Sequence, residues 1–131
     1  MKRMIPILLM MTLLLTGCAV PKPATEANTY RHITMQEPDE MMEKEENYII
    51  LDVRTQEEFA AGHIPGAIVI PNETIGTEEI PQLPDKDQLI MVYCRSGNRS
   101  KQASDKLVKL GYTNIVEFGG IIDWPGEVVT D

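Results

Sequence analysis

Cysteine and histidine are both scarce in this sequence, with two of each among 131 residues. Two cysteines cannot supply the several disulfides of a small cross-linked scaffold, so the fold has to depend on an ordinary hydrophobic core. Metal sites are usually built from several thiols and imidazoles, and this small supply argues against a dedicated metal site. We therefore expect a globular domain that holds no metal.

Basic residues are fewer than acidic residues. The chain has 12 Lys and Arg against 20 Asp and Glu, which gives a formal net charge of -8. Binding to nucleic acid needs a basic face, so this balance excludes nucleic acid as an expected partner. The length allows one ordinary domain, and the sequence contains no internal repeat.

The sequence also lacks an apolar run long enough to cross a bilayer, which takes about 20 residues. Its longest apolar run covers residues 4–15. This run follows Lys2 and Arg3 and is itself followed by small residues. That layout is typical of a secretory signal peptide.

The end of this segment, "LTGC", resembles the lipobox of bacterial lipoproteins. In those proteins the chain is cut before the cysteine, which then carries lipid such as palmitate. The resemblance implies a signal peptide over residues 1–17, a lipidated Cys18 with a tether over 18–29, and a domain over 30–131. It also implies an extracytoplasmic protein anchored in a bacterial membrane, at the periplasmic face of an outer membrane or in the outer leaflet of the cell membrane. An uncleaved anchor and a signal without lipidation are the alternatives.

Strand and helix patterns alternate beyond residue 30. Short apolar runs predict strands, and amphipathic stretches predict helices between them. The predicted strands cover 30–33, 48–53, 67–70, 89–93 and 114–118, and the predicted helices begin at Pro38 and Thr55 and cover 99–110, with a helical turn at 74–80. This alternation predicts an α/β domain with a mainly parallel sheet, in which ligands bind at the carboxyl ends of the strands.

Cys94 lies at such a strand end and is the one free thiol if Cys18 carries lipid. The loop after it is Arg95, Ser96, Gly97 and Asn98, and Arg99 begins the next helix. Glycine permits a positive φ, so the backbone N–H groups of this loop can converge into an anion-binding cradle. The helix N-terminus and the two arginines add positive charge, which favours a nucleophilic thiolate in a partly exposed loop. The alternative is a structural cysteine buried in the core.

The length of this loop separates two chemistries. Cysteine phosphatases have five residues between the cysteine and the arginine of their signature. Here four residues separate Cys94 from Arg99, and Ser100 occupies the position of the phosphatase arginine. A shorter loop makes a smaller cradle, which suits a single sulfur atom better than a tetrahedral phosphate.

Three segments, "LDVRTQEEFAAGHIPGA", "YCRSGNRS" and "GGIIDW", resemble in order and spacing the motifs of single-domain rhodaneses. The resemblance covers residues 30–131 and implies a three-layer α/β fold, with a mainly parallel central sheet flanked by helices. It implies that Cys94 takes a sulfur atom from a small sulfur-containing anion such as thiosulfate, forms a persulfide, and passes the sulfur to a thiol or cyanide. Residues 95–99 would bind the anions, and no cofactor is needed. The alternative is a non-catalytic rhodanese-like lipoprotein module that binds a protein or a sulfur species.

Three further residues of these motifs are expected to have supporting roles. Asp52, near the end of a strand, is predicted to accept hydrogen bonds from loop backbone, with a general base as the alternative. Arg54 is expected to pair with a nearby carboxylate such as Glu58. His63 is expected to orient a turn, with a catalytic role beside the cysteine as the alternative. The sequence identifies no partner for His32.

Overall fold

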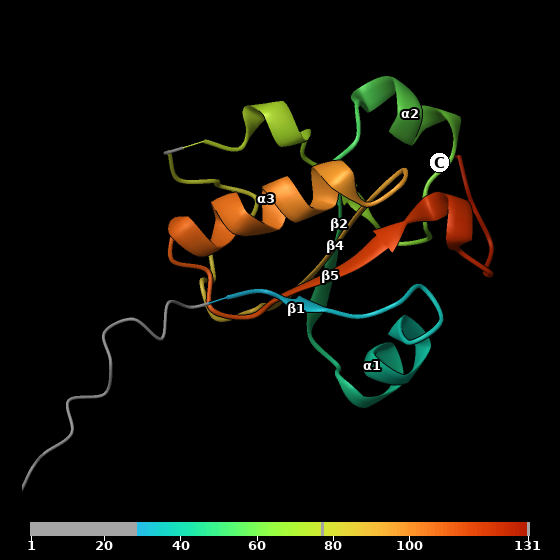
Figure 1. Ribbon diagram of the computed structural model, residues 1–131, viewed down its shortest axis with the longest axis horizontal. Helices are drawn as coiled ribbons and strands as arrows, with labels where there is room; N and C mark the ends of the chain where they lie inside the picture. Colours follow the sequence, from blue (N-terminus) through green and yellow to red (C-terminus); the bar gives the residue numbers. More distant parts are fainter. Residues whose placement is uncertain (1–28, 77, 131) are drawn as a thin grey trace, which may run out of the picture.

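The structure is a computed structural model that describes residues 29–76 and 78–130 (Figure 1). The predicted signal peptide, lipidated Cys18 and most of the tether lie outside the described residues. Within the described ranges, no helix is both long enough and apolar enough to span a membrane.

Five parallel strands form one sheet in the order β1-β5-β4-β2-β3. The strands are β1 (Arg31–His32), β2 (Tyr48–Asp52), β3 (Ile68–Val69), β4 (Leu89–Cys94) and β5 (Ile115–Gly120). All six residues of β4 are buried, because this central strand is covered on both faces. The predicted parallel sheet is confirmed, and it contains no antiparallel strand within the described residues.

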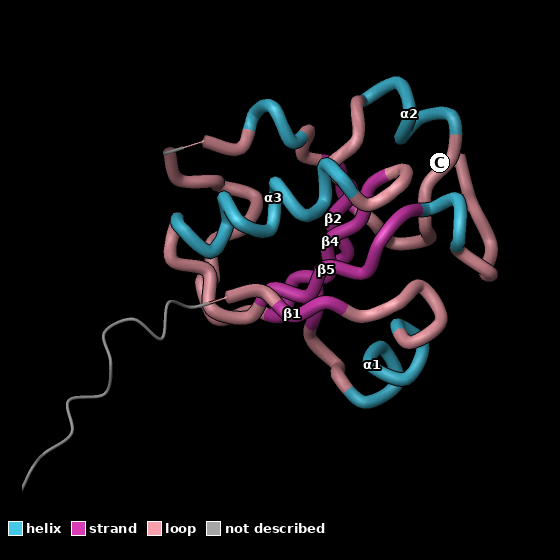
Figure 2. Tube along the Cα trace, viewed as in Figure 1, coloured by secondary structure: helices cyan, strands magenta, loops and turns pink. Residues whose placement is uncertain are grey.

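The helices form the outer two layers. They are α1 (Pro38–Lys44), α2 (Gln56–Ala61) and α3 (Asn98–Lys109), with 3-10 turns η1 (Asn72–Thr74) and η2 (Ile121–Asp123). Figures 1 and 2 show α3 and α1 on opposite faces of the sheet. The predicted helical turn at 74–80 is wrong, because the 3-10 turn begins directly after Pro71 and ends at Thr74, whose hydroxyl donates to the Pro71 carbonyl.

Alternate residues of β4 pack into two separate cores. Val92 and Cys94 pack with Leu107 of α3 on one face. Met91 and Tyr93 pack on the other face, where α1 and α2 contribute side chains. This alternation follows from the two-residue period of a strand, and it places the Cys94 side chain on the face covered by α3.

Candidate active site

Cys94 is the last residue of β4, and it is only 1% exposed. The expectation of a partly exposed loop is confirmed, although the thiol itself is buried. Arg95 and Ser96 of the loop are exposed, while the sulfur lies beneath them. The chain turns back over the cysteine because the first turn of α3 starts only four residues later.

The backbone of the loop directs an N–H group at the sulfur. Gly97 has φ +107°, in the left-handed region that a side chain rarely allows, and its N–H donates to Cys94 Sγ at 2.9 Å. Asn98 has no positive φ and is instead the first residue of α3, one residue earlier than predicted. The structure thus directs the Gly97 N–H at the sulfur, and the binding of an anion by this loop stays a prediction.

Gly120 makes the approach of β5 to this loop possible. A Cβ atom added at Gly120 would lie 2.1 Å from the carbonyl oxygen of Arg95 and 2.6 Å from the Cα of Ser96. The loop is held there by the Ile122 N–H, which donates to the same Arg95 oxygen at 3.3 Å. The end of β5 therefore forms the floor of the loop.

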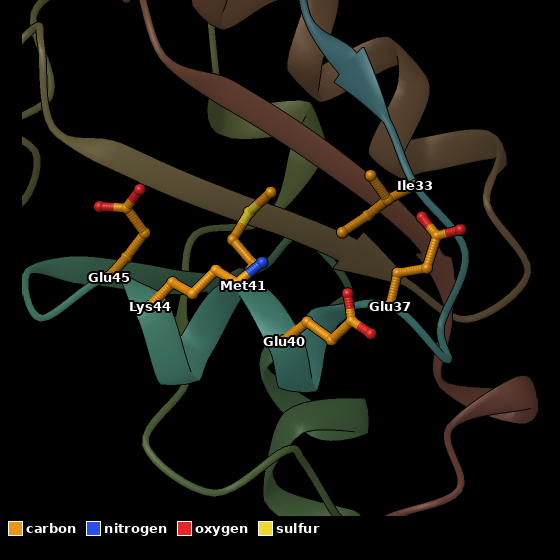
Figure 3. A pocket seen from close by; sticks show the side chains of 6 residues that line it. All are labelled: Ile33, Glu37, Glu40, Met41, Lys44 and Glu45. Atoms are coloured by element: carbon orange, nitrogen blue, oxygen red, sulfur yellow. The ribbon is translucent and has the colours of Figure 1, made fainter.

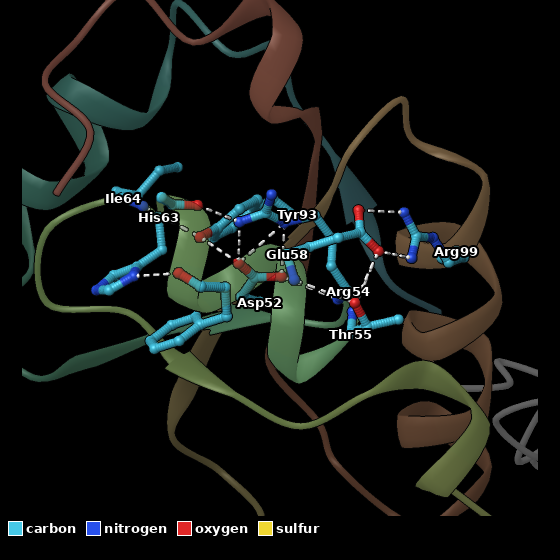
Figure 4. Close-up of polar contacts among 10 residues, drawn as sticks. Asp52, Arg54, Thr55, Glu58, His63, Ile64, Tyr93 and Arg99 are labelled. Carbon is cyan, nitrogen blue, oxygen red and sulfur yellow. Dashed lines mark hydrogen bonds and ion pairs between the residues drawn. The ribbon is translucent and has the colours of Figure 1, made fainter. Parts of the chain in front are cut away.

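The two arginines of the loop have different environments. Arg95 is exposed, and within the described part of the chain its guanidinium forms no ion pair. Arg99 donates two hydrogen bonds to the Glu58 carboxylate, at 2.6 and 3.0 Å (Figure 4). These bonds lower the pKa of Glu58 to about 2. They also raise the pKa of Arg99, with a smaller contribution from Coulombic attraction to Cys94.

Asp52 is fully buried and bonded from several sides (Figure 4). Its carboxylate accepts from the Arg54 backbone N–H at 2.9 Å, from the Arg54 guanidinium at 2.6 Å, and from the Tyr93 hydroxyl at 2.7 Å. Burial, and next the charge of Asp52, raise the pKa of Tyr93, so this phenol stays a donor. Arg54 therefore pairs with Asp52 and not with Glu58, and it also donates to the Gly62 carbonyl at 2.7 Å.

His63 follows α2 in the chain, and its side chain contacts the Phe59 carbonyl and the Phe59 ring. Its Nδ1 lies 2.8 Å from the Phe59 carbonyl oxygen, and its ring stacks on the Phe59 ring with centroids 3.7 Å apart. Its backbone pairs with Val129 in both directions. The structure gives His63 the surroundings of a residue that holds the turn after α2.

A buried hydrogen-bond chain, which the sequence analysis did not identify, leads from Cys94 to the molecular surface. The Cys94 thiol lies 3.4 Å from Ser100 Oγ, and the Ser100 hydroxyl donates to Glu117 Oε1 at 2.6 Å. The other oxygen of Glu117 contacts Nδ1 of His32. The one available signal in the sequence was a carboxylate inside an apolar strand, since Glu117 interrupts the run from Ile115 to Phe118.

A polar hollow of about 400 Å³ lies beside the Cys94 loop. It is lined by His32, Gln36, Ser96, Lys101 and Asp123, among others. A second hollow of similar volume lies against α1 (Figure 3). Its walls are Ile33, Met41, Lys44 and the three acidic residues Glu37, Glu40 and Glu45. No residue of the Cys94 loop belongs to this second hollow, and its three carboxylates against one lysine would repel an anion.

Metal ligands do not gather anywhere in the described ranges: no three or more His, Cys, Asp or Glu side chains are placed to hold a metal ion. The carboxyl end of β4 brings together a buried thiol, the Gly97 N–H that donates to it, and two arginines in the following loop and helix. Arg95 supplies a positive charge with which an anionic ligand can pair, while Glu58 balances the charge of Arg99.

Comparisons with known proteins agree with this geometry. A family model described as Rhodanese-like domain matches residues 34–126. The thiosulfate sulfurtransferase PspE of Escherichia coli is 37% identical over 73 residues, which make up 56% of this chain and 70% of that protein. A sulfurtransferase of Allochromatium vinosum is 42% identical over 82 residues, 60% of this chain and 73% of that protein. The crystal structure of a rhodanese-related protein from Thermoplasma volcanium matches with a TM-score of 0.65 and 31% identity, covering 78% of this chain and 100% of that one. The chain belongs to the family of rhodanese-like domains.

Proposed function

We propose that this protein is a sulfurtransferase that carries sulfur as a persulfide on Cys94. The observation that carries the proposal is the geometry at the end of β4. There the Gly97 N–H donates to Cys94 Sγ at 2.9 Å, and the chain enters α3 directly afterwards. A donor fixed in this way stabilises a sulfur anion without reorganising during the reaction.

The donor is a small anion with a terminal sulfur, such as thiosulfate. The Cys94 thiolate attacks that outer sulfur, a new S–S bond forms, and the old S–S bond breaks with its electron pair leaving on sulfite. The persulfide keeps one negative charge on its outer sulfur, which is attached to the Sγ atom that the Gly97 N–H faces. A thiol or cyanide then attacks the outer sulfur of the persulfide and regenerates the Cys94 thiolate.

Arg95 and Arg99 differ in what they can offer to the incoming anion. Arg95 is exposed and unpaired in the described part of the chain, so it can attract the donor without losing another contact. Arg99 is held by Glu58, which fixes its position and balances its charge. In the proposed donor site, Arg95 is therefore the cation that attracts the anion.

Mass spectrometry of the full chain after thiosulfate treatment tests this proposal. Trypsin cuts after Lys86 and Arg95 and so releases Cys94 in a peptide of residues 87–95. We expect that peptide to gain one sulfur atom, and the Cys18→Ser chain to gain it equally. A gain that persists in Cys94→Ser, or no gain in the wild-type chain, would contradict the proposal and favour the binding module.

We also propose that Cys18 carries lipid and anchors the domain to a membrane on the extracytoplasmic side. The support is the "LTGC" segment after an apolar run with a basic start. Labelled palmitate should enter the wild-type chain in cells, while Cys18→Ser should remain unlabelled and uncut. Equal labelling of Cys18→Ser would refute the lipid anchor, and Cys94→Ser is the matched control because it removes the other thiol.

A further inference from the structure

Glu117 is a fully buried carboxylate that the proposed sulfur transfer does not use. Burying a charge is costly unless the charge is paired and hydrogen-bonded. Glu117 Oε1 accepts from the Ser100 hydroxyl at 2.6 Å and from the Gly119 N–H at 2.8 Å, and Oε2 contacts Nδ1 of His32. The hydrogen bond to Ser100 links this carboxylate to Cys94, so its function should be sought at the Cys94 loop.

The Ser100 hydroxyl has one proton and several acceptors. Glu117 Oε1 lies at 2.6 Å, the Gly97 carbonyl oxygen at 2.9 Å and Cys94 Sγ at 3.4 Å. While Cys94 is a thiol, its S–H donates to Ser100 Oγ and the hydroxyl proton goes to Glu117. Once the sulfur is an anion, a Ser100 lone pair facing it would be repulsive, so the hydroxyl has to donate to the sulfur.

This change leaves the Ser100 oxygen without a donor, and it leaves the Gly119 N–H as the remaining donor to Glu117 Oε1. One proton supplies the missing donor, if it sits on Glu117 and is donated to Ser100 Oγ. The ionisation of the Cys94 thiol and the protonation of Glu117 are then a single coupled event. The buried carboxylate loses its charge as the sulfur, which has the Gly97 N–H and the start of α3 beside it, gains one.

We propose that Glu117 accepts the proton of the Cys94 thiol through the Ser100 hydroxyl, and that His32 holds the carboxylate in position. The S–H bond breaks with its electron pair remaining on sulfur, an O–H bond forms at Ser100, and the former Ser100 proton moves to Glu117 Oε1. The proton stays on Glu117 while the sulfur alternates between thiolate and persulfide, and it returns when the thiol reforms. The inference deepens the proposed function and rests on it for its role in turnover.

His32 connects this series of hydrogen bonds to solvent. Its side chain is 54% exposed and borders the polar hollow beside the loop, while Nδ1 contacts Glu117. The register of the sheet fixes this contact, because His32 of β1 is the direct partner of Glu117 in β5. The other charged groups near these hydrogen-bonded residues are Lys101 and Arg99 of α3, Arg95 of the loop and Asp123 of η2.

Replacing Glu117 with glutamine distinguishes this role from simple electrostatics by the sign of the effect. A nearby negative charge opposes ionisation of a thiol, so its removal alone would favour the thiolate. Loss of the proton acceptor has the opposite effect. We expect iodoacetamide to alkylate Cys94 at least about tenfold more slowly in Glu117→Gln at pH 7, which is a shift of about one pH unit.

The measurement is the pH dependence of alkylation in the full chain, read on the peptide of residues 87–95. At pH 10, where the thiolate forms without help, Glu117→Gln should react at the wild-type rate. A rate at pH 7 that is unchanged or faster overturns the proposal, and so does a rate lowered equally at every pH. Glu43→Gln is the matched control, because it makes the same change on an exposed residue of α1 and should leave the profile unchanged.

Two further variants keep the test decisive if Glu117→Gln proves unstable in thermal melting. His32→Asn retains an N–H group where Nδ1 lies and should keep the wild-type profile, whereas His32→Ala should shift it upward. Ser100→Ala should also slow alkylation at pH 7, and adding Glu117→Gln to it should cause no further slowing. Independent slowing by both changes would overturn the relay. If Glu117→Gln shifts the alkylation profile as expected but the wild-type chain gains no sulfur from thiosulfate, the proposed function alone is refuted.

Discussion

Gly120→Ala should lower the rate of sulfur transfer by displacing the backbone of the Cys94 loop, without changing any side chain of that loop. The added Cβ would meet the Arg95 oxygen at 2.1 Å, the Arg95 carbonyl carbon at 2.6 Å and the Ser96 Cα at 2.6 Å. None of these atoms belongs to a flexible side chain, so either the Cys94 loop or the end of β5 has to move. Restoring an ordinary contact of about 3.4 Å requires a displacement of about 1 Å.

A displacement of that size is expected to lower both stability and activity. Overpacking of this kind costs about 1–3 kcal/mol in the free energy of unfolding. A shift of about 1 Å in reacting groups lowers the rate about 100-fold. The assay is the rate of sulfur transfer from thiosulfate to cyanide, together with thermal melting. Gly76→Ala is the matched control, because a Cβ there meets nothing within 4 Å. Wild-type turnover by Gly120→Ala would show that the loop does not need its present position.

Three other changes test the surroundings of the loop. The pKa of Glu58 is lowered from 4.5 to about 2, so its pair with Arg99 stabilises the fold fully above about pH 4.5 and is lost as the pH falls toward 2. In urea unfolding, Glu58→Gln should therefore have a free energy of unfolding about 0.5–1 kcal/mol below that of the wild type at pH 7, and the difference should disappear near pH 2. Asp52→Asn leaves the buried Arg54 without its counter-charge and should lower the free energy of unfolding by about 3–5 kcal/mol, while an effect below about 1 kcal/mol would contradict this account. Arg95→Ala should raise KM for thiosulfate about fivefold with little change in kcat, as expected for an exposed charge worth about 1 kcal/mol, and equal KM values at low salt would contradict its role in attracting the donor.

The fold and the position of Cys94 could be predicted because both depend on local patterns. Apolar runs separated by amphipathic stretches indicated a parallel α/β sheet, and the glycine in the Cys94 loop indicated a left-handed backbone. The structure has both, with Gly97 at φ +107°. The predicted helix start at Thr55 is also present, as a capping box in which Thr55 and Glu58 are bonded to each other's backbone.

The partners of charged side chains could not be predicted in the same way. Sequence proximity favoured Glu58 as the partner of Arg54, but the capping box holds Glu58 at the start of α2, where Arg99 of α3 reaches it. His32 and Glu117 are 85 positions apart and meet only because β1 pairs with β5 in one particular register. Such contacts depend on strand order and register, which hydrophobic periodicity does not determine.

Cys94 itself shows the same distinction. Its place at the end of a buried strand could be read from the sequence, whereas the contact that buries the sulfur could not. The burial depends on β5, whose Gly120 allows the loop backbone to lie directly over the strand end. The polar loop residues predicted an exposed loop. This is correct for Arg95 and Ser96, while the sulfur below them is buried.

The pairing of β1 with β5 has a consequence for the order in which this chain folds during synthesis. Among the strands that the structure describes, β1 is the first to leave the ribosome and its partner β5 is the last, and most of the domain lies between them in sequence. His63 likewise pairs with Val129 near the end of the described chain. Contacts of such high sequence separation form late and slow the folding of a domain. The nascent chain therefore stays unable to assemble its sulfur site until β5 has emerged, and a chain that stops before β5 has a thiol without its floor or its buried carboxylate.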